Sequence, residues 1–361
     1  MDIDYFKKNF EPEITRRFEN REFPGMAISI IEDGAIIYSF GVGFRDIKNF
    51  KDFNADTLAR FGSGSKSFTS LAILLLEDQG NLSVDDPISD YLSITTSTGT
   101  EAITIHHLLT HTSGLPDIFI DRMGYTREEY LERVASIIKD SRADLGRFMY
   151  SNIGYSLLAM IVEKTSRKSF DEAMRGLILT PLNMKRTIML GDEELASIDD
   201  NHTVPYLPKK DEYGNLTFTK SEYRFEEFTK GPGGIVTSCN EMLIYLDMLM
   251  NNGSVGGKTV FKPSVIEKKL SRYLKDENLT KMLKTDSFEG YGIGIKDGYK
   301  GQTFMNVAGG IVGGISLIGF YKETKIGFAC IGNSEGFPLM FIYDVWDKTL
   351  DNDPVFKNWN K

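Results

Sequence analysis

Two residues three positions apart, Ser63 and Lys66, form the pair with the clearest chemical potential in this sequence. They lie at the start of residues 63–79, which are apolar at most positions and predict a buried helix that ends at Gly80. One turn of that helix places Lys66 within reach of the Ser63 hydroxyl. The helix start favours negative charge on the serine oxygen, and burial lowers the pKa of a lysine unless a negative partner opposes it. A serine beside a base is what nucleophilic catalysis requires.

The same stretch has two other interpretations. In one, Ser63 only caps the helix and Lys66 is a solvated surface charge. In the other, the stretch is a phosphate-binding loop, but that motif needs a glycine immediately before the lysine, and Ser65 stands there. The sequence therefore argues against nucleotide binding and leaves the capping interpretation open.

A second candidate group is Tyr150 and Asn152, which flank Ser151. In an extended segment, residues two apart point to the same side, so both side chains can face one cleft. A phenol beside a cation loses its proton more readily than at its free pKa of about 10. An asparagine offers both a donor and an acceptor to a substrate amide. The alternative is that Asn152 only caps the helix that follows.

The elements that position these residues fall into three blocks along the chain. The first is a surface helix over 4–19 and two strands, 26–31 and 35–40, whose Asp33-Gly34 turn is typical of a hairpin. The second block is mainly helical, and further helices and strands follow it. The predicted helices are 105–110, 126–139, 153–165, 170–179, 240–251 and 339–350, and the later strands are 290–295, 304–307, 314–321 and 325–331.

This order predicts a mixed α/β (α+β) fold with one largely antiparallel sheet made from N- and C-terminal strands and flanked by helices. A mainly helical lobe is inserted between those strands. We expect a single catalytic domain over 1–361, with a sheet lobe at about 1–62 and 205–361 and a helical lobe at about 63–204.

Composition excludes several classes of function. The 361 residues carry a net charge of −9, so polyanions such as nucleic acids and anionic membranes are not expected partners. His107 and His111 have a helical zinc-pair spacing but lack the H-E-x-x-H pattern, so neither metal nor cofactor is expected. Cys239 and Cys330 have no CxxC spacing and are expected to be buried free thiols.

The N-terminal residues lack the basic and apolar pattern of a signal peptide, and the most apolar run, 71–76, is far shorter than the roughly 20 residues of a membrane span. We therefore expect a cytoplasmic protein. The sequence leaves the oligomeric state open, a homo-oligomer included.

Taken together, these motifs resemble the serine β-lactamase and penicillin-binding protein superfamily, in particular its class C-like branch with family VIII esterases and D-aminopeptidases. The S-x-x-K of Ser63–Lys66 and the Y-S-N of Tyr150–Asn152 occur in the order of that branch. Four connecting stretches also match, namely 80–88 (GNLSVDDPI), 103–115 (ITIHHLLTHTSGL), 181–184 (PLNM) and 233–238 (GGIVTS).

The resemblance implies a sheet lobe and a helical lobe with the active site between them. It implies that Ser63 is the acylated nucleophile, that Lys66 and Tyr150 share the role of general base, and that Asn152 orients the substrate. Which of the two is the base stays open. The backbone N–H groups of Ser63 and Gly310 would form the oxyanion hole.

The chain departs from the family pattern at the third element, a K-T-G or H-x-G on an edge strand. Aligned on its glycines, the stretch Val307-Ala308-Gly309-Gly310 puts valine where a basic residue usually binds a substrate carboxylate. Val307, Ala308 and Gly309 are then the substrate-binding residues of this strand. Because a charge-assisted hydrogen bond contributes about 1.5–3 kcal/mol, carboxylate-bearing substrates should bind less well.

We therefore expect a serine hydrolase that forms an acyl-enzyme on Ser63, an esterase or amidase for small neutral acyl substrates, with small esters, amides or short peptides as ligands. One alternative is a β-lactamase or a D-alanyl or D-amino-acid peptidase, in which another cation replaces the missing one. A second alternative is a catalytically silent binding protein on the same scaffold.

Overall fold

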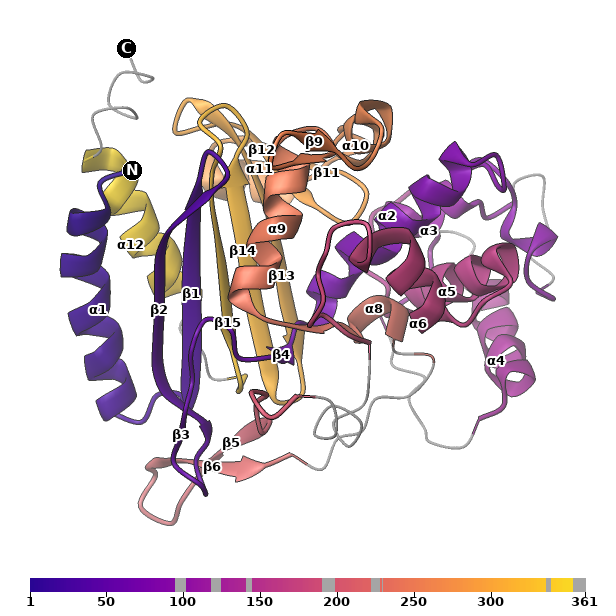
Figure 1. The fold of residues 1–361 in the computed structure, drawn as a ribbon. Helices are drawn as coiled ribbons and strands as arrows, with labels where there is room; N and C mark the ends of the chain where they lie inside the picture. Colours follow the sequence, from indigo (N-terminus) through magenta and orange to yellow (C-terminus); the bar gives the residue numbers. More distant parts are fainter. Residues whose placement is uncertain are drawn as a thin grey trace.

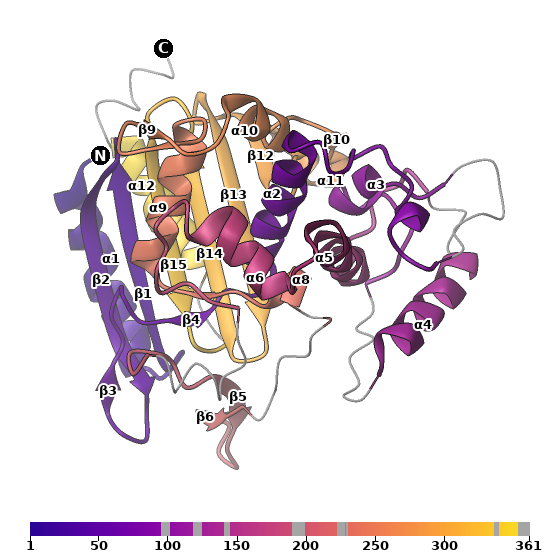
Figure 2. The ribbon, with the colours of Figure 1, turned by 45° about the vertical axis from the view of Figure 1, so that its right-hand side comes forward.

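The computed structural model describes residues 1–94, 102–117, 125–140, 145–189, 199–221, 228, 230–335 and 339–352. A tall sheet forms one part of the molecule and a group of helices stands beside it (Figure 1). Figure 2 shows the same two parts after a turn that brings the helical group forward.

The sheet has nine strands in the order β10-β11-β12-β13-β14-β15-β1-β2-β3, and all neighbouring pairs are antiparallel. The first strand, β1, pairs with the last, β15, so that the two ends of the sequence meet in the middle of the sheet. The strands are β1 (Gly25–Glu32), β2 (Ala35–Asp46), β3 (Lys51–Asp52), β10 (Leu274–Lys275), β11 (Asp286–Glu289), β12 (Gly294–Tyr299), β13 (Gln302–Ile311), β14 (Gly314–Tyr321) and β15 (Ile326–Gly332).

Two helices, α1 (Ile3–Glu19) and α12 (Leu339–Asn352), lie side by side on one face of the sheet (Figure 1). Their apolar side chains, among them Phe6 and Trp346, form one core cluster with residues of β1, β14 and β15. The opposite face carries α9 (Cys239–Met250) and the helical lobe, which share the second and larger cluster. Both faces of the sheet are therefore covered.

The helical lobe begins with α2, whose residues Ser65–Leu76 are all buried. Its apolar positions face the sheet on one side and α5 on the other, which is why the sequence shows no polar face there. The helices of this block are α2 (Ser65–Asp78), α3 (Ile105–Leu109), α4 (Arg127–Asp140), α5 (Asn152–Ser166) and α6 (Phe170–Met174), the last continued by a π-helical turn at Arg175–Leu179.

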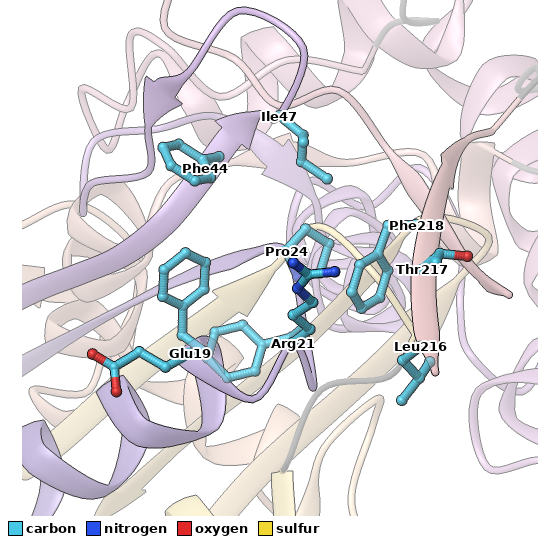
Figure 3. A pocket seen from close by; sticks show the side chains of 10 residues that line it. Glu19, Arg21, Pro24, Phe44, Ile47, Leu216, Thr217 and Phe218 are labelled. Carbon is cyan, nitrogen blue, oxygen red and sulfur yellow. The ribbon is translucent and has the colours of Figure 1, made fainter. Parts of the chain in front are cut away.

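The remaining elements are short. They are β4 (Ala59–Arg60) with β7 (Val236–Thr237), β5 (Tyr206–Lys210) with β6 (Leu216–Lys220), β8 (Ser254–Val255) with β9 (Lys258–Thr259), the helices α8 (Lys230–Gly233), α10 (Pro263–Lys269) and α11 (Glu277–Leu283), and the 3₁₀ turns η1 (Gly62–Gly64) and η2 (Ile88–Asp90). Figure 3 shows a cavity of about 440 Å³ between the end of α1, β2 and β6, in which Arg21 reaches up between Pro24 and Phe218.

The predicted fold class is confirmed: one antiparallel sheet joins the N- and C-terminal strands, and a helical block interrupts it. Two local predictions were wrong. The helix expected from Ser63 begins at Ser65, because Gly62–Gly64 forms a 3₁₀ turn. The strand expected over 290–295 begins only at Gly294, because the backbone N–H of Gly290 bonds the carbonyl of Ile293 in a turn. In the part of the chain that the structure describes, no helix has the length and apolarity of a membrane span.

Candidate active site

Ser63 lies in the 3₁₀ turn that precedes α2, directly against strand β13. This close approach depends on Gly62, whose φ is +59° and whose missing Cβ would stand 2.9 Å from the backbone carbon of Gly310. A side chain at Gly62 would therefore push the turn off the strand and strain the backbone. The cap of α2 is Gly64 and makes no side-chain hydrogen bond, so the interpretation of Ser63 as a helix cap is wrong.

Two side chains, those of Lys66 and Tyr150, meet at the Ser63 hydroxyl. The Nζ of Lys66 lies 3.2 Å from the Ser63 Oγ, and the Tyr150 hydroxyl donates to the same oxygen at 2.8 Å. Lys66 arrives from the first turn of α2, whereas Tyr150 comes from the segment before α5. The structure thus brings together the three residues that the sequence singled out.

Lys66 is buried rather than solvated, with only 3% of its surface exposed. Its ammonium also donates to the Asn152 Oδ1 at 2.6 Å and to the carbonyl of Pro232 at 3.1 Å. Burial lowers the pKa of Lys66 to about 7, and the Asp117 carboxylate opposes that change. A substantial fraction of this lysine is therefore neutral, and able to accept a proton, near neutral pH.

Tyr150 behaves differently from the expectation. Burial raises the pKa of its phenol to about 12, and the hydrogen bond with Ser63 opposes that rise without cancelling it. The prediction that this phenol loses its proton more readily than a free one was wrong, because desolvation is the largest effect on its pKa and the charges of Asp117 and Glu289 add to it. Lys66 instead lies over the ring, with its Nζ 4.7 Å from the ring centre.

Asn152 is the first residue of α5, and Ser151 is the cap, its hydroxyl accepting from the N–H of Gly154. The interpretation of Asn152 as the cap is therefore wrong. Its side-chain oxygen binds Lys66, and its Nδ2 donates to Asp117 at 2.8 Å. The buried amide thus links the lysine to the exposed carboxylate of Asp117.

His111 contacts Tyr150 and the backbone beside it. Its ring stacks on the phenol with centres 4.7 Å apart, and its Nδ1 accepts the backbone N–H of Ser151 at 3.0 Å. Burial lowers the pKa of His111 to about 3, so the ring is neutral. Among the described residues, no group of three or more His, Cys, Asp or Glu side chains is placed to hold a metal ion.

The strand beside Ser63 has a free edge where substrate can lie. Strand β12 pairs with β13 only as far as Gly294 opposite Asn306, so residues 307–311 pair with β14 alone. Gly309 is buried and packs so closely on the Phe61 carbonyl that a Cβ there would lie 2.2 Å from its oxygen, whereas Gly310 is exposed with open space in front of it. The glycines therefore let the strand approach the Ser63 turn while keeping the edge accessible.

A cavity of about 310 Å³ joins this edge to the three side chains at Ser63. Val307 and Ala308 line it, and Val307 is 8% exposed. Lys66 and Lys296 are the two cationic side chains among the described residues of its lining, and no arginine is among them. The described residues that line the cavity are Ser63, Lys66, His111, Phe148, Tyr150, Leu279, Glu289, Gly292, Ile293, Gly294, Ile295, Lys296, Asn306, Val307 and Ala308.

Sequence reasoning missed several of these residues. His111 was considered only as a metal ligand, although its position in the stretch 103–115 ties it to the family motif. Asp117, Glu289 and Lys296 carry no spacing signal, because they reach the site from separate segments of the chain.

The comparisons with known proteins identify the family and the fold. The model of the Beta-lactamase family matches residues 10–346. Among curated relatives, "Penicillin-binding protein 4*" of Bacillus subtilis (strain 168) is 33% identical over 181 residues, or 47% of this chain and 38% of that protein. "Protein flp" of Staphylococcus aureus (strain MW2) is 29% identical over 187 residues, or 48% of this chain and 36% of that protein.

The alignments to these curated relatives thus span well under half of their length. A solved structure gives wider coverage: the octameric penicillin-binding protein homologue from Pyrococcus abyssi has a TM-score of 0.81 and 32% identity. That match covers 95% of this chain and 76% of the other. With a family match over nearly its whole length and this fold, the chain belongs to the Beta-lactamase family, within the serine β-lactamase and penicillin-binding protein superfamily, and membership implies a serine hydrolase in general.

Proposed function

We propose that this protein is a serine hydrolase that forms a covalent acyl-enzyme on Ser63 and acts on small esters or amides with a neutral acyl group. The observation that carries the proposal is the position of the Ser63 Oγ, within hydrogen-bond reach of both Lys66 and Tyr150 at the edge of a cavity. A nucleophile beside a base and an open strand edge is the arrangement that acyl transfer needs.

In the first step the Ser63 Oγ bonds to the substrate carbonyl carbon and passes its proton to neutral Lys66. We assign the base to Lys66 because its pKa is about 7, whereas that of Tyr150 is about 12. Tyr150, still protonated, hydrogen-bonds the serine oxygen and can relay the proton toward the leaving group as that bond breaks. Water then attacks the acyl-enzyme, and the same groups transfer protons in the reverse order, which returns the proton to Ser63.

The oxyanion of this reaction would lie between the N–H groups of Ser63 and Gly310. Gly62 holds the serine turn against Gly310, which supports that placement. Losing one donor of a comparable hole costs about 2.7–4 kcal/mol. Asn152 would hold Lys66 in place and present its amide near the substrate.

The preference for a neutral acyl group rests on Val307. It lines the cavity at the position where the family has a cation, and it offers neither charge nor donor. The cavity of about 310 Å³ also favours a small substrate. Ala308 and Gly309 would continue the substrate-binding edge.

A second candidate function is β-lactam or D-amino-acid peptide cleavage. Lys296 favours it, because this lysine lines the same cavity and is a cation that a substrate carboxylate could use. The names of the Bacillus and Pyrococcus relatives point the same way. An oligomer, like that of the octameric Pyrococcus homologue, is compatible with either function.

The main proposal predicts a rapid burst of nitrophenol when p-nitrophenyl butyrate is mixed with the protein, because acylation precedes a slower deacylation. A fluorophosphonate should add its mass to Ser63 in a single stoichiometric step, read by peptide mass spectrometry. Absence of both the burst and the adduct would leave a catalytically silent binding protein as the better description.

The substrate preference has its own test. We expect kcat/KM for p-nitrophenyl butyrate to exceed that for nitrocefin by about ten- to a hundredfold, because the β-lactam carboxylate lacks its usual charge-assisted partner. Parallel progress curves on one preparation measure this ratio. Faster turnover of nitrocefin, or a stable penicilloyl adduct, would favour the second candidate.

A further inference from the structure

A second group of polar side chains lines the cleft away from Ser63. Glu289 is the last residue of β11, Gly294 the first of β12, and Asn306 lies on β13. Glu289 is paired directly with Gly294, and Gly294 with Asn306, so the three residues form one row across the sheet. Directly paired residues of antiparallel strands point to the same face. All three line the cavity that contains Ser63.

Gly294 leaves a hollow between the other two. A Cβ at this position would lie 3.5 Å from the Asn306 carbonyl oxygen and 3.6 Å from its side-chain oxygen, ordinary contact distances. Gly294 therefore leaves the room of a side chain beside the Asn306 amide, in the cavity that Glu289 also lines. The Asn306 Nδ2 donates to the Tyr343 hydroxyl at 3.1 Å, which directs the amide nitrogen away from the cavity and leaves the oxygen as an acceptor.

The carboxyl group of Glu289 has no hydrogen-bond or ion-pair partner among the residues that the structure describes, although the residue is only half-exposed. Burial raises the pKa of Glu289 to about 8, with the charge of Asp276 adding to the effect and that of Lys296 opposing it. A half-buried carboxyl without a partner is costly to the fold, so a role in binding accounts for it better than a structural one.

Lys296 does not form an ion pair with the Glu289 carboxyl. It lies diagonally across from Glu289, two residues beyond Gly294 on β12, where such neighbours are about 7–8 Å apart. Its ammonium instead faces three aromatic rings, Phe304 at 5.2 Å, Tyr343 at 5.5 Å and Tyr299 at 5.7 Å from the ring centres. Cation–π contact satisfies this lysine in place and leaves the carboxyl of Glu289 open to a ligand.

We propose that Glu289, Gly294 and Asn306 form a subsite that binds a primary ammonium group of the substrate, while the neutral acyl group lies at Ser63. The Glu289 carboxyl supplies the opposite charge when it is ionised, which a bound ammonium favours and which is complete above its pKa of about 8. The Asn306 oxygen supplies a second acceptor, and the missing side chain of Gly294 supplies the room. The subsite rests on the proposed function, since it names the class of substrate that the same cleft takes: a small ester or amide that carries a primary amine.

The test uses simple ligands of matched shape, primary n-alkylamines and the corresponding n-alkanols from butyl to octyl. As inhibitors of p-nitrophenyl butyrate cleavage, the amines should bind about ten- to a hundredfold more tightly than the alkanols, the range of a charge-assisted hydrogen bond. Glu289→Gln keeps the size of the side chain and removes its charge, so it should abolish the difference. Asp286→Asn, a substitution of an exposed carboxylate on the same strand, should preserve it.

The same ligands are titrated calorimetrically into the Ser63→Ala protein, which separates this proposal from the catalytic one. Tighter binding of the amine there supports the subsite even if no ester is cleaved. Equal binding of amine and alkanol, or a preference that survives Glu289→Gln, overturns it. So would tighter binding of the n-alkanoates with loss in Lys296→Met, because the cation would then be the recognition group.

Discussion

Ser63→Ala is expected to lower kcat for p-nitrophenyl butyrate by about 10⁴-fold or more and to eliminate the nitrophenol burst. The Ser63 Oγ is the atom to which both Lys66 and Tyr150 are directed, so no neighbouring hydroxyl can take its place without a change of geometry. Steady-state and stopped-flow kinetics measure the two effects. The residual rate would come from binding and from the N–H groups at the turn.

Ser67→Ala is the matched control for that experiment. Ser67 is a buried serine on α2, the helix that follows the Ser63 turn, and its hydroxyl bonds the Tyr245 hydroxyl at 3.0 Å. It does not belong to the described lining of the cavity. Its substitution should cost about 1 kcal/mol of stability and leave kcat within a few-fold of the wild type. An active Ser63→Ala protein would refute the assignment of the nucleophile.

Lys66→Met should lower kcat/KM by about 10²–10⁴-fold at pH 8 and change its dependence on pH. The base works only when unprotonated, and the pKa of Lys66 is about 7. In the wild type about a tenth of this lysine is neutral at pH 6 and about nine-tenths at pH 8, so kcat/KM should rise across that range. Without the amine, the rise should disappear. The pH profile of kcat/KM measures both effects.

Two substitutions test whether Lys66, and not another ionisable group, causes the rise of kcat/KM with pH. Glu289 has a pKa of about 8 and lines the same cleft, so the rise must survive in Glu289→Gln if Lys66 causes it. Lys269 is a second fully buried lysine, bonded to backbone and hydroxyl groups around α2. Lys269→Met should reduce stability but keep the pH profile. A rise that persisted in Lys66→Met would assign the base elsewhere.

The sequence allowed Ser63, Lys66 and Tyr150 to be grouped as one candidate site because each lies in a short local motif. Ser63 and Lys66 are three residues apart, in the turn before α2 and in its first turn, and Tyr150 precedes Ser151, the cap of α5. Their meeting depends on how two helices pack, which the family motifs indicated and periodicity alone did not. The antiparallel sheet was predictable from the order of elements, because strand follows strand directly at both ends of the chain instead of alternating with helices.

What the sequence did not show depends on burial and on contacts between distant segments. The pKa of Tyr150 was expected to fall because of a nearby charge, yet desolvation, a property of the packed structure, raises it. Strand β11 has only 4 residues, too few to show an alternation of apolar and polar side chains, so Glu289 was not expected on a strand. Its place in the cleft follows from its register with Gly294 and then Asn306.

The pairing of β1 with β15 has a consequence for synthesis of the protein. The Ser63 turn is translated before Gly310 and the strand that carries it, which follow much later in the sequence. The N-terminal hairpin must therefore wait, with one edge unpaired, until the C-terminal strands are translated. In the proposed mechanism Ser63 therefore meets Gly310, its partner in the oxyanion hole, only after β13 has been translated and has paired with β14.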